Sequence, residues 1–473
     1  MKITLEQLKE RFCKKTVSVI GIGVSNTPLI DFLLDMGAFV VARDKKDEQA
    51  LGDLATALRA KNVKLVLGER YLDDIHEDFI LKTPGIRFDT PQIAEAVKRG
   101  AVLSSEMELF FEVCPCKIVA VTGSDGKTTT TTLISEILKE EFRRTGSKSK
   151  VFLGGNIGKP LLAETPQMSS QDVAVLELSS FQLQTMRQSP DIAVVTNITP
   201  NHLNFHVDMQ EYIDAKTNIF AYQKSSDRIV LNADNSVTAG FIGHTPGKSC
   251  CFSTALTLES LPKTELCAYL DKDVLTVSDE NGSHAIMSRD EIRLPGIHNV
   301  QNYMAAILAL WGEVSVDSVR TVAREFGGVE HRLELVREKD GVRYFNSSID
   351  TSPTRTAAAL RSFSERPIVI CGGYDKHIPF EPLAEVLIER ARAVVLTGAT
   401  AQKIGDAIMN NPNFDFKKLP LYFEKEFHEA VKTASKIAHK GDVVILSPAC
   451  ASFDAFENFA ARGRFFKSLV MEL

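Results

Sequence analysis

The sequence predicts an α/β protein of three domains, each built on a largely parallel sheet. Three apolar, β-branched runs that end in glycine occupy residues 17–23, 117–123 and 367–373. Parallel strands are buried on both faces, read as continuous Val/Ile runs and connect through helices. The chain has 473 residues, which is too long for one hydrophobic core. We expect domains at residues 1–115, 116–327 and 328–473.

The first domain opens with part of a nucleotide-binding pattern. Its first strand ends in Gly21 and Gly23, as in dinucleotide-binding fingerprints, but Asn26 replaces the third glycine. Asp44 lies about twenty residues further on, where such folds place an acid on a sugar hydroxyl. A nucleotide site and simple turn chemistry both fit this pattern. The domain's other strands are expected at residues 39–41 and 79–81.

The middle domain opens with a phosphate-binding loop. Residues 117–132, KIVAVTGSDGKTTTTT, run from an apolar strand through glycines to a lysine and a row of threonines. Glycines let backbone N–H groups turn inward, the lysine supplies positive charge, and the first hydroxyl after it can ligate Mg²⁺. Val121 stands where the usual, longer loop has its first glycine. The loop residues are Gly123, Ser124, Asp125, Gly126, Lys127, Thr128 and Thr129.

Polar side chains follow further strands of the middle domain. Ligands of open parallel sheets collect beyond the carboxyl ends of the strands, where Glu177 and His202 are expected. A buried carboxylate beside a phosphate loop needs a cation, so Glu177 and Thr128 are candidate Mg²⁺ ligands. A solvated strand end and a structural histidine are the alternatives. The strands are expected at residues 173–178, 192–197 and 228–232, with an antiparallel flap at 254–293 and a helix at 303–310.

Lys216 and the third domain give weaker signals. Lys216 lies in the predicted helix QEYIDAKTNIF and, by spacing alone, reads as an exposed lysine. In the third domain a helix is expected after SPACAS, and its N-terminus, with Ser452 and Lys376, can hold a small carboxylate. The helical spacing of Phe453, Phe456 and Phe459 indicates a core stripe.

Composition excludes several classes of protein. The net charge of −6 argues against a nucleic-acid surface, which needs a basic excess. The N-terminal residues lack the apolar core of a signal peptide, and no run approaches the roughly 18 apolar residues of a membrane span. The eight cysteines lack metal-type spacing and are expected to be free thiols. We expect a cytoplasmic enzyme that binds neither nucleic acid nor membrane.

Several segments together resemble the Mur ligases of peptidoglycan synthesis. They are TGSDGKTTT, GGNIGKPLL, ELSSFQL, NHL, the AK pair, PGIHNVQN, EHRLE and LSPACASFDAF, in order along all three domains. ELSSFQL and SPACAS favour the member that adds D-glutamate, whereas the loop alone also fits a folylpolyglutamate synthase. The resemblance implies an N-terminal Rossmann-like domain for the UDP end of the substrate, a central P-loop ATPase sheet, and a C-terminal Rossmann-like domain for the amino acid.

The resemblance also implies roles for residues. The UDP-substrate positions are Gly21, Gly23, Ser25, Asp44, Thr83, Pro84, Gly85, Asn156 and His202. Positions around ATP, besides the loop, are Asn299, Asn302 and Arg332. Positions around D-glutamate are Thr351, Lys376, Ser452 and Phe459. A family lysine that matches Lys216 is carbamylated, which turns a cation into an anion able to hold a second Mg²⁺. The implied catalytic residues are Lys127, His202 and Lys216, and the metal positions are Thr128, Glu177, His202 and Lys216.

Two segments depart from the family pattern. The family segment N-D-S-K-A-T-N reads NSSIDTS at residues 346–352, so Ser347 and Ile349 replace its aspartate and lysine. Asp350 and Arg355 are candidates to take over part of their work. Asn201 and Asn204 stand where relatives often carry acids near the histidine.

The implied reaction is amide formation at the expense of ATP, through an acyl phosphate, between UDP-N-acetylmuramoyl-L-alanine and D-glutamate. A monomer is expected, with two Mg²⁺ sites. One alternative is a related ligase with another amino acid or a folate acceptor. Another is a nucleotide-binding partner of the same fold that no longer ligates, as the Ser347 and Ile349 replacements suggest. A NAD-dependent dehydrogenase fits less well, because Asn26 breaks the fingerprint.

Overall fold

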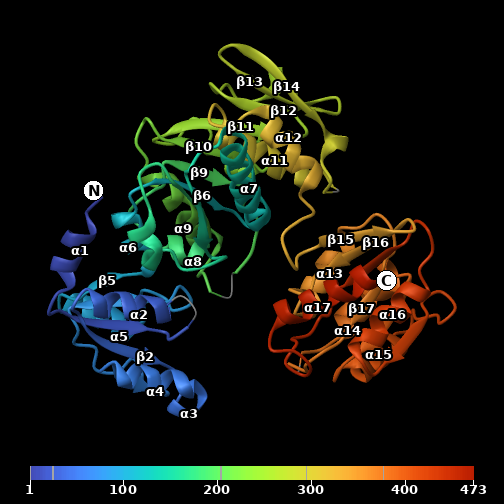
Figure 1. Ribbon diagram of the computed structural model, residues 1–473, viewed down its shortest axis with the longest axis horizontal. Helices are drawn as coiled ribbons and strands as arrows, with labels where there is room; N and C mark the ends of the chain where they lie inside the picture. Colours follow the sequence, from blue (N-terminus) through green and yellow to red (C-terminus); the bar gives the residue numbers. More distant parts are fainter. Residues whose placement is uncertain (1, 24–25, 203–204, 295, 377) are drawn as a thin grey trace. The chain divides into compact units, whose positions relative to one another are not determined.

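The computed structural model describes residues 2–23, 26–202, 205–294, 296–376 and 378–473. They form two compact units, Met1–Arg324 and Glu325–Leu473. The first unit contains two sheets and the second contains one (Figure 1). The predicted residues Ser25 and Asn204 lie outside the described residues.

The N-terminal sheet has the strand order β3-β2-β1-β4-β5, and all its pairs are parallel. The strand order reverses beside β1, because β2 and β3 lie on one side of it and β4 and β5 on the other. This places the loops after β1 and β4 at the topological switch point where such sheets bind ligands. The strands are β1 Thr16–Ile20, β2 Phe39–Asp44, β3 Lys64–Leu67, β4 Phe79–Lys82 and β5 Val102–Ser104. The helices are α1 Leu5–Phe12, α2 Asn26–Asp35, α3 Glu48–Leu51, α4 Asp53–Ala60, α5 Pro91–Lys98 and α6 Glu106–Val113.

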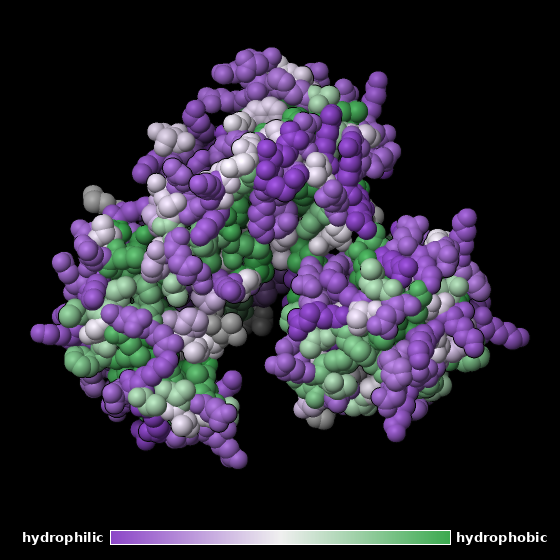
Figure 2. Space-filling model, in the orientation of Figure 1, coloured by the Kyte–Doolittle hydropathy of each residue, from purple (hydrophilic) through white to green (hydrophobic). Residues whose placement is uncertain are grey.

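The middle sheet has nine strands in the order β14-β13-β12-β11-β10-β9-β6-β8-β7. Strands β12, β13 and β14 pair antiparallel, which confirms the predicted flap, and the other pairs are parallel. In Figure 2 the outer surface of this flap, at the top of the view, is mostly hydrophilic. The strands are β6 Lys117–Thr122, β7 Val151–Gly155, β8 Val173–Glu177, β9 Ile192–Val195, β10 Arg228–Asn232, β11 Lys248–Ser253, β12 Cys267–Asp271, β13 Val274–Asp279 and β14 Gly282–Ser288.

Helices α7 and α11 pack against each other beside the middle sheet (Figure 1). The α11 sequence is apolar almost all round, and every side chain from Asn302 to Leu310 is buried. A helix that is apolar on all faces is stable only when it is covered on all faces. The helices are α7 Lys127–Thr145, α8 Ser180–Leu183, α9 Met209–Ala221, α10 Ser236–Ala239, α11 Ile297–Leu310 and α12 Val316–Glu325.

The second unit has the strand order β15-β16-β20-β17-β18-β19, in which only the edge strand β15 pairs antiparallel. Figure 2 shows hydrophobic patches among hydrophilic residues on its visible face. The strands are β15 Glu334–Lys339, β16 Val342–Asn346, β17 Ile368–Cys371, β18 Ala393–Thr397, β19 Leu421–Glu424 and β20 Val443–Leu446. The helices are α13 Pro353–Arg361, α14 Glu381–Arg390, α15 Ala401–Met409, α16 Phe427–Lys436 and α17 Phe459–Glu472.

The α/β fold class is confirmed, and the structure corrects one local prediction. The helix after SPACAS begins only at Phe459, because residues 452–458 form turns and bends. Phe453 is 66% exposed and Phe459 is 37% exposed, so the predicted core stripe was wrong. The domain boundaries stay predictions. Within the described ranges, no helix is long and apolar enough to cross a membrane.

Candidate active site

The phosphate-binding loop joins β6 to α7 and requires glycine at two positions. A Cβ on Gly123, which has φ +148°, would lie 1.9 Å from Thr196 Oγ1. A Cβ on Gly126, which has φ +78°, would lie 2.6 Å from Asn302 Oδ1. Only glycine combines these backbone angles with such close contacts. Gly126 is also the N-cap of the 19-residue helix α7, so the positive end of the helix dipole opens onto the loop. This geometry suits a bound phosphate.

Hydrogen bonds from the end of β9 hold the loop in place. The N–H groups of Ser124 and Asp125 donate to the carbonyl and side-chain oxygens of Asn197, at 2.8 and 2.9 Å. Thr196 Oγ1 donates to the Asp125 carbonyl at 2.6 Å. Lys127 Nζ donates to the Ser124 carbonyl at 2.8 Å. The loop is therefore shaped before any ligand arrives, and Thr196 is a contributor that the sequence analysis missed.

The first turn of α7 and two asparagines of α11 surround the loop. Thr128 is buried and Thr129 is half-buried in that turn. Asn302 Oδ1 accepts a hydrogen bond from Thr130 Oγ1 at 3.2 Å. Asn302 Nδ2 donates to Asn299 Oδ1 at 3.1 Å. The structure thus brings both predicted asparagines to the phosphate loop, although they follow it by more than 170 residues.

Lys216 lies inside the site, which corrects the interpretation from its helical spacing. Its side chain is 2% exposed, and Nζ donates to the Gly123 carbonyl at 2.8 Å and to Thr122 Oγ1 at 3.3 Å. The ammonium also lies 4.7 Å from the ring centre of Tyr212, one helical turn earlier. Burial, with repulsion from Lys127, lowers the pKa of Lys216 well below its usual value.

Glu177 presents a buried carboxylate oxygen that no described residue satisfies. Its Oε1 accepts from Asn156 Nδ2 at 2.7 Å, whereas Oε2 is buried without a hydrogen bond among the described side and main chains. An unpaired buried carboxylate oxygen is unfavourable unless a cation balances it. Across the described part of the chain, no three His, Cys, Asp or Glu side chains form a metal cluster. A Mg²⁺ ion here would need further oxygens, such as the Thr128 hydroxyl, phosphate and water.

His202 adopts a left-handed backbone, with φ +55°, near both lysines. Partial burial of its ring, followed by the charges of Lys127 and Lys216, lowers the pKa of His202. These effects favour the neutral imidazole. The ring packs edge-on against Phe181, with 5.0 Å between the ring centres. The structure thus gathers Lys127, His202 and Lys216 at one place.

The loops after β1 and β4, which are predicted to bind the UDP end of the substrate, lie close together at one edge of the N-terminal sheet. A Cβ on Gly21 would lie 2.7 Å from Thr83 Cγ2, and the Thr83 N–H donates to the Ile20 carbonyl at 2.9 Å. Gly23 has no such constraint, because a Cβ there would contact no atom of the described residues within 4 Å. Asn26, which replaces the third fingerprint glycine, donates through Nδ2 to the Gly21 carbonyl at 2.8 Å. Asn26, the residue that departs from the fingerprint, therefore holds the loop after β1 in place.

Asp44 connects the first two loops of this sheet. Its Oδ2 accepts from the Ile22 N–H at 2.6 Å, and its Oδ1 accepts from the Lys46 N–H at 2.8 Å. Each carboxylate oxygen has a second lone pair, so contact with a sugar hydroxyl is still available. Pro84 and Gly85 follow β4 at the same edge of the sheet.

In the second unit, two of the residues predicted to contact D-glutamate touch each other. Lys376 Nζ donates to the Thr351 carbonyl at 3.1 Å. Ser452 is 2% exposed, whereas the Phe459 ring is partly exposed at the start of α17. Their loops follow β16, β17 and β20, which are adjacent in the sheet.

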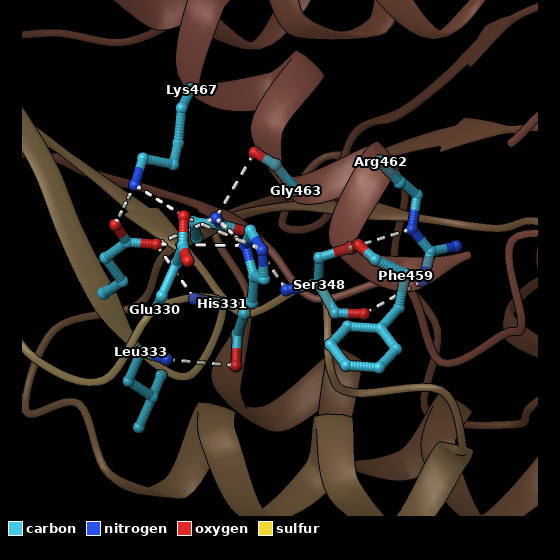
Figure 3. Close-up of polar contacts among 11 residues, drawn as sticks. Glu330, His331, Leu333, Ser348, Phe459, Arg462, Gly463 and Lys467 are labelled. Carbon is cyan, nitrogen blue, oxygen red and sulfur yellow. Dashed lines mark hydrogen bonds and ion pairs between the residues drawn. The ribbon is translucent and has the colours of Figure 1, made fainter. Parts of the chain in front are cut away.

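Arg462 joins two of these loops and was not predicted from the sequence (Figure 3). Its side chain is buried, and Nε donates to Ser348 Oγ at 3.0 Å. The two terminal nitrogens donate to the carbonyls of Ala451 and Cys450, both at 3.1 Å. The Ala451 carbonyl also accepts from the Tyr374 N–H at 3.0 Å, which adds the third loop. These donors hold together the three segments that carry the predicted residues.

The segment that departs from the family pattern is largely internal. Asp350 accepts from Ser447 Oγ at 2.8 Å, and burial raises the pKa of its carboxyl group. Ser347 is buried and its Oγ accepts a backbone N–H. Arg355 donates to the Ile349 carbonyl at 3.2 Å. Asp350 therefore stabilises the fold in this structure. That it also takes over part of the work of the family aspartate stays a prediction.

Arg332, the remaining predicted ATP residue, belongs to the second unit and follows a buried histidine. His331 has φ +64°, and its Nδ1 lies 2.9 Å from Asn346 Nδ2. Lys467 donates to Glu334, and Asn346 Nδ2 donates to the same carboxylate at 3.0 Å. Figure 3 shows this network around His331. It fixes the backbone beside Arg332.

Three family profiles match the chain in the order of its sheets. They are the Mur ligase MurD-like N-terminal domain at residues 15–104, the Mur ligase middle domain at 121–310, and the Mur ligase glutamate ligase domain at 331–450. Curated relatives named UDP-N-acetylmuramoylalanine--D-glutamate ligase match over full length. Those of Clostridium novyi and Clostridium kluyveri are 47% and 48% identical and cover 100% of both chains, and that of Acetivibrio thermocellus is 47% identical over 99%.

Solved structures of low sequence identity share the fold. UDP-N-acetylmuramate-alanine ligase MurC of Thermotoga maritima has a TM-score of 0.53 at 18% identity and covers 97% of this chain and 99% of its own. A structure of UDP-N-acetylmuramoyl-L-alanyl-D-glutamate--2,6-diaminopimelate ligase has a TM-score of 0.56 at 17% identity and covers 98% and 94%. With the full-length relatives and the three matched domains, these findings show that the chain belongs to the Mur ligase family.

Proposed function

We propose that this protein adds D-glutamate to UDP-N-acetylmuramoyl-L-alanine in peptidoglycan precursor synthesis, with conversion of ATP to ADP. The full-length relatives of the same name support this substrate pair. The observation that carries the proposal is the phosphate loop, with the buried amine of Lys216 and the unsatisfied oxygen of Glu177 among its surroundings. Mur ligases use ATP with Mg²⁺, which fits this combination of groups. We place the enzyme in the cytoplasm, as a monomer.

In the proposed reaction an oxygen of the alanyl carboxylate attacks the γ-phosphorus of ATP, and ADP leaves. The amine nitrogen of D-glutamate then attacks the carbonyl carbon of the acyl phosphate, phosphate leaves, and the nitrogen loses a proton. Bound Mg²⁺ would neutralise charge on the phosphate oxygens. Lys127 would stabilise the negative charge on the γ-phosphate during its transfer, and the N-terminus of α7 would bind the phosphates. Asn299, Asn302 and Arg332 would complete the ATP site.

Glu177 and Thr128 would hold Mg²⁺ through the oxygens that the fold presents. His202 would orient the attacking carboxylate and complete a second metal position with Lys216. A carbamate at Lys216 would form when the neutral amine attacks the carbon of CO₂ and loses a proton. Burial favours the neutral amine, because it lowers the pKa of Lys216. The side chain would then carry a negative charge that can bind a cation.

The substrate ends would occupy the loops described above. The UDP-linked acceptor would contact Gly21, Gly23, Ser25, Asp44, Thr83, Pro84, Gly85, Asn156 and His202. D-Glutamate would contact Thr351, Lys376, Ser452 and Phe459, where the Lys376 ammonium can pair with a carboxylate.

One assay separates this function from its alternatives. Purified protein is given ATP, Mg²⁺ and UDP-N-acetylmuramoyl-L-alanine with each of a panel of D- and L-amino acids, and ADP release is recorded. The proposal predicts release with D-glutamate and little with the others. Release with another amino acid would identify a related ligase. Nucleotide binding without release in any combination would identify a non-ligating protein, as the Ser347 and Ile349 replacements allow.

A further inference from the structure

Arg87 crosses from the N-terminal sheet domain to the middle domain. It lies in the loop after β4, residues 83–90, two positions beyond the predicted UDP-substrate residues 83–85. Its guanidinium donates two hydrogen bonds to Glu211 of α9, from NH1 to Oε2 at 3.1 Å and from NH2 to Oε1 at 2.8 Å. NH1 also donates to the Phe205 carbonyl at 2.8 Å. These three bonds fasten the loop to residues that surround the proposed catalytic groups.

A second carboxylate orients Arg87 for this contact. Asp89, on the same loop, accepts from Nε and NH2 of Arg87, both at 2.8 Å. All five guanidinium N–H groups therefore have acceptors. The side chains of Arg87 and Glu211 are only 23% and 24% exposed. A two-bond contact of this kind is stronger and more specific in direction than an ordinary surface ion pair.

Glu211 is the centre of a wider set of contacts. Its Oε2 accepts from the Val207 N–H at 2.7 Å, and its Oε1 accepts from Gln184 Nε2 at 3.1 Å. The hydrogen bonds from Arg87 lower the pKa of Glu211 to about 2. The carboxylate therefore joins the N-terminal domain to the C-terminal end of α8 and to the start of α9.

An aromatic cluster continues from Glu211 to His202. His206 Nδ1 lies 3.4 Å from Glu211 Oε2, and His206 Nε2 lies 2.9 Å from Ser180 Oγ. The His206 ring stacks on Phe181 with 5.7 Å between centres, and Phe181 packs edge-on against His202 at 5.0 Å. His206 Nδ1 makes no hydrogen bond among the described residues, so ring packing and the contact with Ser180 hold this cluster beside Glu211.

A second set of contacts continues along α9 to the phosphate loop. Tyr212, which follows Glu211, has its hydroxyl 3.0 Å from Ser124 Oγ in the loop. The Tyr212 ring also lies beneath the Lys216 ammonium. A shift of the first turn of α9 would therefore move groups that contact both Ser124 and Lys216.

We propose that the contact between Arg87 and Glu211 is a clasp that positions His202 and the phosphate loop against the loop that binds the UDP-linked acceptor. Arg87 and Glu211 are positioning residues, because they act through the residues that they hold. This inference rests on the proposed function. Its consequence is that the acceptor carboxylate and the γ-phosphate meet correctly only while the clasp is closed. Misplacement by about 1 Å is enough to slow a reaction about 100-fold.

Kinetics of Arg87→Met, Glu211→Gln and the double variant test the clasp. We expect each single change to lower kcat/KM for the UDP-linked acceptor about 10- to 100-fold, with the Kd for ATP changed less than about twofold. The double variant should be no slower than the slower single variant, because both remove the same contact. Arg87→Lys should restore little, since an ammonium cannot form the two-bond contact. Arg70→Met, which removes an exposed pair with Asp73, is the matched control and should act like wild type.

Hydrogen exchange tests the clasp without any activity. Peptides that cover residues 205–211 should exchange faster in Arg87→Met than in wild type or Arg70→Met. The reason is that Glu211, which accepts from the Val207 N–H, is then no longer held by Arg87. Asp89→Asn is a milder change, and its exchange rate should lie between those of wild type and Arg87→Met. It replaces Arg87→Met in this test if Arg87→Met does not fold. Unchanged exchange, or purely additive kinetic effects, would overturn the clasp. A wild-type protein inactive with every amino acid would instead overturn the proposed function, while the exchange result still decides the clasp.

Discussion

Replacement of Gly123 by alanine perturbs the phosphate loop at its tightest point. The new Cβ would lie 1.9 Å from Thr196 Oγ1, whereas real Cβ contacts stay beyond 3.0 Å. Thr196 must therefore turn away and lose its 2.6 Å bond to the Asp125 carbonyl. A lost buried hydrogen bond costs about 1–3 kcal/mol. The positive φ of +148° adds about 1–2 kcal/mol for a residue with a side chain.

The free energy of unfolding of the middle domain should therefore fall by about 2–5 kcal/mol. The affinity for ATP should fall at least about tenfold, because the cradle loses its shape. Urea unfolding and isothermal titration with a non-hydrolysed ATP analogue measure the two effects. Gly23→Ala is the matched control for these two measurements, since a Cβ there contacts none of the described residues within 4 Å and its φ is not positive. In the double variant Gly123→Ala/Thr196→Ala the clash with Thr196 Oγ1 disappears, while the approaches to the Asn197 backbone at 3.1 and 3.2 Å stay, so the effects should add only in part. Wild-type affinity for ATP in Gly123→Ala, or full additivity in the double variant, would show that the loop does not require glycine at this position.

The remaining predictions concern charged groups of the first unit. Lys216→Ala should lose at least about 100-fold in kcat and regain part of it with acetate or another short carboxylic acid, which can replace the carbamate oxygens; full activity without added acid would exclude the carbamate. Glu177→Gln should raise the Mg²⁺ concentration needed for half-maximal activity about tenfold or more, because a neutral amide is a weaker cation ligand; an unchanged Mg²⁺ titration would remove Glu177 from the metal site. The pKa of Glu211 lies at about 2 in the fold against 4.5 as its ordinary value, so its stabilising effect is present above pH 4.5 and is lost as the pH falls toward 2. Acid unfolding of Arg87→Met should therefore depend less steeply on pH in that window, and an identical acid profile would count against the ion pair.

The sequence predicted those parts of the fold and site that depend on local patterns. The apolar runs marked the central strands, and the order of glycines, lysine and threonines located the phosphate loop. Glu177 was expected at a strand end, and it lies there. These features follow from period, turn chemistry and strand polarity, all of which act over a few residues.

The rest depends on contacts between distant residues. Helical spacing placed Lys216 on an exposed face. In the fold its side chain is internal, and Nζ donates a hydrogen bond to the carbonyl of Gly123, 93 residues away in the sequence. The clasp joins Arg87 to Glu211 across 124 residues, and no pattern along the chain marks either one. Arg462 reads as an ordinary helix residue until the loops around it are seen. Helix α17 begins only at Phe459, because the N–H groups of Ala455 and Phe456 donate to the Ser452 carbonyl in a turn and the Asn458 side chain caps the helix.

Release of ADP that depends on D-glutamate, measured with UDP-N-acetylmuramoyl-L-alanine and Mg²⁺ present, decides whether the protein catalyses the proposed ligation. We expect one ADP and one new amide for each D-glutamate consumed, and loss of both products in Lys127→Ala, which retains the UDP-substrate site. Amide formation by Lys127→Ala at the wild-type rate, or the absence of any D-glutamate-dependent ADP from the wild-type protein, would contradict the proposed reaction.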